Sequence, residues 1–122
     1  MKGGAVPLNP RIAGQIEAEA MQFLGTPYAR DFNCMTFVRA VYRAVGLTLP
    51  PMALNVTTAD LVNPPIGYVL YVQHKQAPRR GYSHVVIILP RRRCIHCSYY
   101  FGRKVVITDL DELMALYDIA DA

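Results

Sequence analysis

The chain has 122 residues, a formal net charge of +4 and 52% hydrophobic residues. This length fits a single domain, residues 1–122, and the composition excludes an intrinsically disordered chain. No apolar run is long enough to span a bilayer, and no apolar segment follows Lys2 as a secretory signal would require. The basic residues do not alternate with aromatic residues as in nucleic-acid-binding modules, so we expect no nucleic-acid partner.

The N-terminal half predicts two helices. Asn9 is a suitable N-cap and Pro10 a suitable first helical residue, and apolar residues then recur at helical spacing up to Gly25. A second helix begins at Cys34, carries an apolar stripe and closes at Gly46. We expect the segment that follows, up to the first strand, to be irregular or briefly helical.

The C-terminal half predicts strands and a short final helix. Its aromatic and β-branched runs favour β-structure. The predicted strands are Tyr68–Val72, His84–Leu89, Arg93–Tyr99 and Lys104–Thr108. Acidic residues at positions 109, 111 and 112 suit the first turn of the final helix. Helices followed by strands are typical of an α+β domain, with N-terminal helices packed on a central antiparallel sheet.

Cys34 and His84 form a candidate nucleophile and base. The unpaired N–H groups and positive dipole at a helix start favour the thiolate of Cys34. His84 precedes a buried strand and could take the thiol proton, then return it to a leaving amine. His96, one strand later, could orient that base. Packing roles for Cys34 and His84 are the alternatives, and His74 is interpreted as a loop residue.

The Cys94–Cys97 segment also admits a metal site, because thiolates and imidazole bind zinc. A closed site needs four ligands, and on a strand Cys94 and His96 would share one face while Cys97 points to the other. We therefore predict no metal and no cofactor, and a small zinc-bound interaction domain stays as an alternative. A Cys94–Cys97 disulfide requires the strand to end there.

Several motifs follow one another in a set order between about residues 18 and 108. They are Phe23–Tyr28, Asn33–Val38, Gly46–Pro50, Ser83–Val85, Ile95–Ser98, and Gly102 with Val105–Val106. This series resembles the NlpC-type papain-like cell-wall cysteine peptidase family. The resemblance implies a papain-like α+β fold and hydrolysis of amide bonds in peptidoglycan stem peptides or cross-links.

Carried over position by position, the resemblance makes Cys34 the nucleophile, His84 the general base and His96 the orienting group. Tyr28 matches a family tyrosine near the active site. Its hydroxyl could help hold the oxyanion beside the backbone N–H of Cys34. The alternative for Tyr28 is a packing aromatic in a turn.

The chain departs from the family pattern around the cleft. Asn33 stands where the family has Asp, and Met35–Thr36 replaces a small Ser-Gly pair. Arg30 and Asp31 lie where glycines are usual, and we expect them to contact the charged ends of a stem peptide. These changes keep the nucleophile and base but alter the residues expected to bind substrate, Asn33 among them.

The absence of a visible leader extends the resemblance to small amidases that serve as interbacterial toxins, such as type VI secretion effectors. Such a protein is made in the cytoplasm, acts at the cell wall or periplasm of a target cell, and needs an immunity protein as inhibitor. A phage lysis enzyme is also compatible. A further alternative is a non-catalytic module that binds wall peptide or protein on the same fold.

Overall fold

The structure of the protein is a computed structural model that describes residues 8–77 and 81–120. The N-terminal stretch in which no secretory signal is predicted lies mostly outside these residues. The helices are α1 (Pro10–Met21), α2 (Cys34–Ala44), α3 (Leu110–Leu116) and the short 3-10 helices η1 (Met52–Leu54) and η2 (Ala59–Val62). The strands are β1 (Val69–His74), β2 (His84–Leu89), β3 (Arg93–Ser98), β4 (Lys104–Asp109) and β5 (Tyr117–Ile119).

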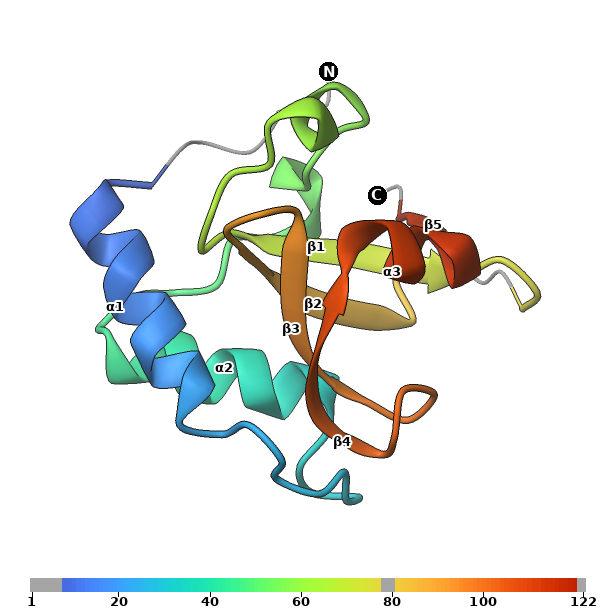
Figure 1. Ribbon diagram of the computed structural model, residues 1–122, viewed down its shortest axis with the longest axis horizontal. Coiled ribbons are helices and arrows are strands. Elements are labelled where there is room, and N and C mark those ends of the chain that lie inside the picture. The colour runs from blue at the N-terminus through green and yellow to red at the C-terminus, as the bar shows by residue number, and fades with distance from the viewer. Residues whose placement is uncertain (1–7, 78–80, 121–122) are drawn as a thin grey trace.

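The strands form one sheet in the order β4-β3-β2-β1-β5, and all neighbours are antiparallel (Figure 1). The first four strands follow one another as a meander. The chain then crosses the sheet through α3, so that β5 pairs with β1 at the opposite edge. This arrangement confirms the predicted α+β class.

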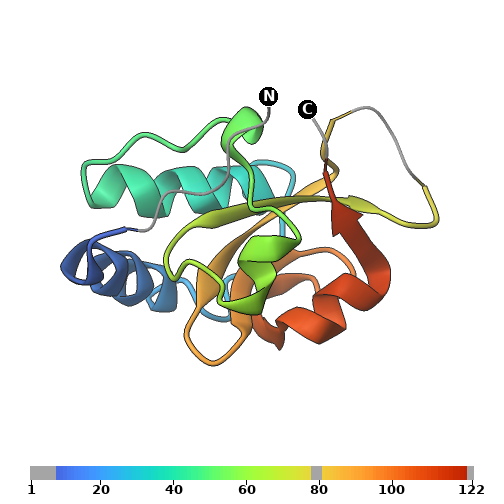
Figure 2. The same ribbon diagram turned by 90° about the horizontal axis from the view of Figure 1, so that it is seen from above.

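The core lies between α2 and the middle of the sheet. Phe37, Val38 and Val41 recur at helical spacing on α2 and are fully buried. Every residue of β2 is buried, as expected for a central strand covered on both faces. α2 packs on β2 and β3, and α1 lies beside α2, while both views place α3 apart from this pair (Figure 2).

Two predictions are wrong at the sheet edge. His74 is not a loop residue: it is the last residue of β1 and pairs with Tyr117. β5 was not expected, because it has three residues and follows α3 directly. Pairing with β5 extends β1 beyond Val72, its predicted end, to His74, because β5 supplies hydrogen-bond partners for the backbone groups of these residues.

The helix ends agree with the predictions to within a few residues. α1 starts at Pro10 behind Asn9, whose side chain accepts a hydrogen bond from the backbone N–H of Arg11. Gly25 follows the turn after α1 with φ +87, a conformation that favours glycine. Across residues 8–77 and 81–120, no helix combines the length and the apolar character needed to traverse a bilayer.

Candidate active site

Cys34 is the first residue of α2, and its side chain is half-buried. The loop before it is held by a capping box. Asn33 Oδ1 accepts hydrogen bonds from the backbone N–H groups of Met35 and Thr36, each at 3.1 Å. Thr36 Oγ1 in turn accepts one from the backbone N–H of Asn33 at 2.6 Å. Asn33 is thus the N-cap of α2, and it sets the direction in which the chain presents Cys34.

A chain of buried polar contacts begins at His84, the first residue of β2. His84 Nε2 lies 2.7 Å from His96 Nδ1. His96 Nε2 lies 3.0 Å from Thr108 Oγ1, and that hydroxyl lies 3.3 Å from Cys94 Sγ. With Thr108 Oγ1 as acceptor from His96 Nε2–H, His96 Nδ1 accepts from His84 Nε2–H. His84 Nδ1 then carries the free lone pair.

Aromatic rings hold both imidazoles in place. Tyr117 stacks on the His84 ring, with centroids 5.3 Å apart and planes 27° apart. Phe101 meets the His96 ring edge to face at 5.5 Å. His96 is fully buried and His84 is 5% exposed. The rings therefore have little freedom to turn away from each other.

Burial decides the charge of these groups. It lowers the pKa of His84 to about 4. Burial, followed by the charge of His84, lowers the pKa of His96 well below its ordinary value. Both rings are consequently neutral at pH 7, which is the form that can accept a proton. Burial raises the pKa of Cys94 to about 12 and that of Cys97 to about 11, so these two thiols stay protonated.

Cys34 and His84 line one open hollow of about 220 Å³. The other lining residues are Tyr28, Ser83, Tyr99, Tyr100 and Tyr117. Tyr28 meets Tyr99 edge to face at 5.7 Å. Its pKa is raised, mainly by burial and then by the nearby Cys34. The structure thus gathers Cys34, His84 and Tyr28 around one space, with His96 behind His84.

The remaining predicted substrate residues lie outside this hollow. Arg30 and Asp31 are exposed in the turn closed by the Ala29–Phe32 bridge, and neither lines the hollow. Asn33 does not line it either, because its side chain is engaged in the cap.

Sequence reasoning missed four residues of the site. Thr108 was assigned only to a strand, yet it lies opposite Cys94 in the β3–β4 register and reaches His96. Tyr99, Tyr100 and Tyr117 were not considered. The adjacent pair Tyr99 and Tyr100 near the end of a predicted strand was a usable signal in the sequence. In the structure both side chains are substantially exposed, at 49% and 62%. Tyr117 gave no signal, because only the sheet crossover brings it to His84.

The segment Cys94–Cys97 lies wholly within β3, which continues to Ser98. Cys94 contacts Thr108, whereas the Cys97 thiol donates to the carbonyl of Phe32 at 3.6 Å. Cys94 and Cys97 are free thiols, so the disulfide alternative is wrong. Within the described part of the chain, no cluster of three or more His, Cys, Asp or Glu side chains is arranged to hold a metal ion.

Comparison of the sequence with protein-family models and with curated proteins finds no match. Solved structures do match. The NlpC/p60 domain of the peptidoglycan hydrolase SagA is 23% identical, with a TM-score of 0.65 over 93% of this chain and 100% of that chain. An NlpC/P60 family protein from Bacillus cereus is 23% identical, with a TM-score of 0.72 over 90% of this chain and 39% of that chain.

A Staphylococcus aureus protein described as similar to a lipoprotein of the NLP/P60 family is 16% identical. Its TM-score is 0.65, over 97% of this chain and 44% of that chain. The resemblance in the sequence motifs and the likeness of the structures thus point to the same architecture. The protein has the papain-like α+β fold of NlpC/p60 domains.

Proposed function

We propose that the protein is a cysteine hydrolase that cleaves amide bonds in peptidoglycan stem peptides or cross-links. One observation carries this proposal: Cys34 and His84 line the same open hollow, while the Nε2 atom of His84 is already engaged by His96. The fold supports the substrate class, because the similar SagA domain belongs to a protein named as a peptidoglycan hydrolase.

In the proposed reaction, His84 Nδ1 takes the proton of the Cys34 thiol, and the sulfur attacks the carbonyl carbon of the amide. The backbone N–H of Cys34 and the hydroxyl of Tyr28 donate hydrogen bonds to the oxyanion. Protonated His84 then gives its proton to the leaving amine, and an acyl-enzyme remains. His84 next activates a water molecule, whose attack releases the carboxylic acid and restores the thiol.

His96 and Thr108 serve this reaction without contacting substrate. In the proposed tautomer, His96 Nδ1 accepts the Nε2–H of His84, which leaves the Nδ1 lone pair of His84 for the thiol proton. It also stabilises the imidazolium that forms during proton transfer, as the third member of a triad does. Arg30 and Asp31 stay proposed contacts for charged ends of the peptide beyond the hollow. The toxin role, the delivery route and the immunity partner stay predictions from the sequence.

The test is digestion of purified muropeptides, with the products identified by mass spectrometry. We expect new fragments from amide cleavage with the native chain and a loss of about a thousandfold or more with Cys34→Ala. His84→Ala should behave alike, because the two groups act as a unit. An unchanged rate for Cys34→Ala would remove Cys34 from the mechanism, and circular dichroism would confirm that the variants fold.

Alkylation near neutral pH separates an enzyme from a non-catalytic binding module. Iodoacetamide should modify Cys34 selectively, with the buried Cys94 and Cys97 as internal controls in the same digest. If Cys34 is alkylated as slowly as the two buried thiols and no muropeptide is cleaved, these results would favour the binding module.

A further inference from the structure

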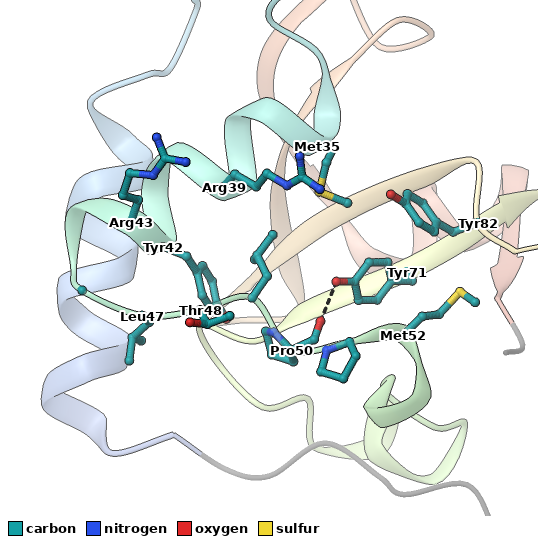
Figure 3. Close-up of a pocket in the computed structure, with 13 residues that line it drawn as sticks. Met35, Arg39, Tyr42, Arg43, Leu47, Thr48, Pro50, Met52, Tyr71 and Tyr82 are labelled. Atoms are coloured by element: carbon teal, nitrogen blue, oxygen red, sulfur yellow. Dashed lines mark hydrogen bonds between the residues drawn. The ribbon is translucent and has the colours of Figure 1, made fainter.

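A second and larger hollow lies next to the proposed active site. It is a groove of about 630 Å³ between one face of α2, the segment 46–52, and Tyr71 and Tyr82 (Figure 3). Met35 and Tyr82 line it, and each is the chain neighbour of a residue that lines the smaller hollow, Cys34 and Ser83 respectively. The groove therefore starts beside the nucleophile and follows α2 away from it.

Hydrogen bonds hold the walls of this groove in place. The Tyr71 hydroxyl donates to the carbonyl of Pro50 at 2.6 Å, which ties the segment 46–52 to the sheet (Figure 3). The Tyr42 hydroxyl donates to the carbonyl of Gly67 at 2.7 Å. The groove is thus formed before any ligand arrives, which reduces the conformational entropy lost on binding.

The charge of the groove is positive. Arg39 and Arg43 are exposed on the α2 side, and no Asp or Glu is among the lining residues. Among the residues that the structure describes, neither arginine forms an ion pair. Arg39 and Tyr71 both line the groove; burial raises the pKa of Tyr71, and the positive charge of Arg39 acts in the opposite direction. An anionic group entering here meets two unneutralised guanidinium groups.

The spacing of these groups suits an extended peptide. Met35, Arg39 and Arg43 form one row along α2, because residues four apart lie on the same face of a helix. Each step of four residues advances about 6 Å along the helix. Two residues of an extended peptide span about 6.6 Å. An extended peptide that runs from Cys34 along α2 would therefore pass Arg39 and then Arg43, and a carboxylate on it would lie near a guanidinium group.

We propose that this groove binds the acidic portion of a peptide substrate, with Arg39 and Arg43 donating hydrogen bonds to its carboxylates. The planar guanidinium group fits a carboxylate in a bidentate pair, and the tyrosine, leucine and proline side chains of the groove supply apolar contacts. This inference rests on the proposed function for the identity of the substrate, a carboxylate-bearing stem peptide. It adds the place on this chain at which the carboxylates bind, the groove with Arg39 and Arg43.

The test measures binding by isothermal titration calorimetry in a Cys34→Ala background, in which turnover is blocked. Two synthetic stem peptides are compared, one with free carboxylates on its glutamate and diamino-acid residues and one with both converted to carboxamides. We expect the acidic peptide to bind about tenfold more tightly. Adding Arg39→Gln or Arg43→Gln should weaken its binding about two- to fivefold and change binding of the carboxamide peptide little.

Arg11→Gln is the matched control, because Arg11 is exposed on α1, does not line the groove, and its loss changes the net charge equally. An equal loss of affinity with Arg11→Gln would show general charge attraction and overturn the proposal. So would equal binding of the two peptides, no binding of either peptide, or a DNA oligonucleotide that binds through the same arginines more tightly than the acidic peptide.

The two proposals fail in different ways. If the native chain cleaves no muropeptide but the arginines still select the acidic peptide in the Cys34→Ala background, the hydrolase assignment falls and the groove assignment stands. If muropeptides are cleaved with a KM that does not change in Arg39→Gln and Arg43→Gln, the groove assignment falls and the hydrolase assignment stands.

Discussion

At the scale of single residues, Thr108 has the least expected role. Its hydroxyl lies at the buried end of the contacts that run through His96 to His84. Because both imidazoles are neutral at pH 7, each carries one ring proton. When the Thr108 hydroxyl accepts from His96 Nε2–H, the tautomers of both rings follow, and Nδ1 of His84 is the nitrogen left to act as the base of the proposed mechanism.

Thr108→Val tests this positioning role, because valine keeps the shape and removes the hydroxyl. We expect kcat for muropeptide cleavage to fall about tenfold or more with KM little changed. The free energy of unfolding should fall by about 1–3 kcal/mol, because His96 Nε2 loses its buried partner. Nitrogen-15 NMR of the histidine rings reports the tautomers directly.

Thr108→Ser is the matched control for that change. It keeps the hydroxyl, so both the tautomers and kcat should stay near those of the native chain. Native kcat and native tautomers in Thr108→Val would show that the hydroxyl only packs against His96.

At the scale of elements, the residues at the start of α2 both stabilise the helix and position Cys34, the proposed nucleophile. The capping box of Asn33 and Thr36 satisfies backbone N–H groups of the first turn and orients Cys34. The start of α1 has a similar cap at Asn9 but no functional side chain nearby in the proposed site. Variants of the two caps therefore separate the effect of helix stability from the effect of the position of Cys34, the proposed nucleophile.

Asn33→Ala should lower the free energy of unfolding by about 1 kcal/mol, because the cap loses its acceptor. Asn33→Asp keeps an acceptor and should stay close to native stability. Urea unfolding measures both variants, and muropeptide cleavage is followed in parallel.

Asn9→Ala is the control, with a similar loss of stability and unchanged kcat. We expect kcat to fall in Asn33→Ala alone. Equal kcat in the two alanine variants, after both are shown to be folded, would contradict a placement role for the α2 cap.

At the scale of the whole molecule, the buried imidazoles make stability depend on pH. The folded-state pKa of His84 is about 4, below its ordinary value near 6.5. Between these values the unfolded chain binds a proton that the folded chain does not. The free energy of unfolding is therefore highest above pH 6.5 and falls as the pH decreases toward 4. His96 adds to this effect in the same direction.

Urea unfolding at several pH values from 7.5 to 4.5 checks this expectation. His84 alone should remove about 3 kcal/mol of stability over that range. His84→Gln should flatten the dependence, because glutamine does not titrate. A native chain that is equally stable at pH 7.5 and pH 4.5 would contradict the burial of neutral imidazoles.

The amino-acid sequence by itself determined the starts of the two N-terminal helices, the central strand and the fold class. The helix starts at Asn9-Pro10 and Asn33-Cys34 follow from capping, which depends on a few neighbouring residues. The central strand at residues 84–89 follows from an unbroken apolar, largely β-branched run. The series of motifs also indicated the NlpC-type fold, which the solved structures share.

Tertiary structure alone decided the surroundings of these groups. Pairing of β4 with β3 brings Thr108 opposite Cys94 and within reach of His96. The crossover through α3 adds β5, lengthens β1 to His74 and stacks Tyr117 on His84. Such contacts depend on strand register and chain crossover between residues far apart in sequence. Local propensity carries no information about either, so the neighbours of Cys34 and His84 follow only from the way the strands pair.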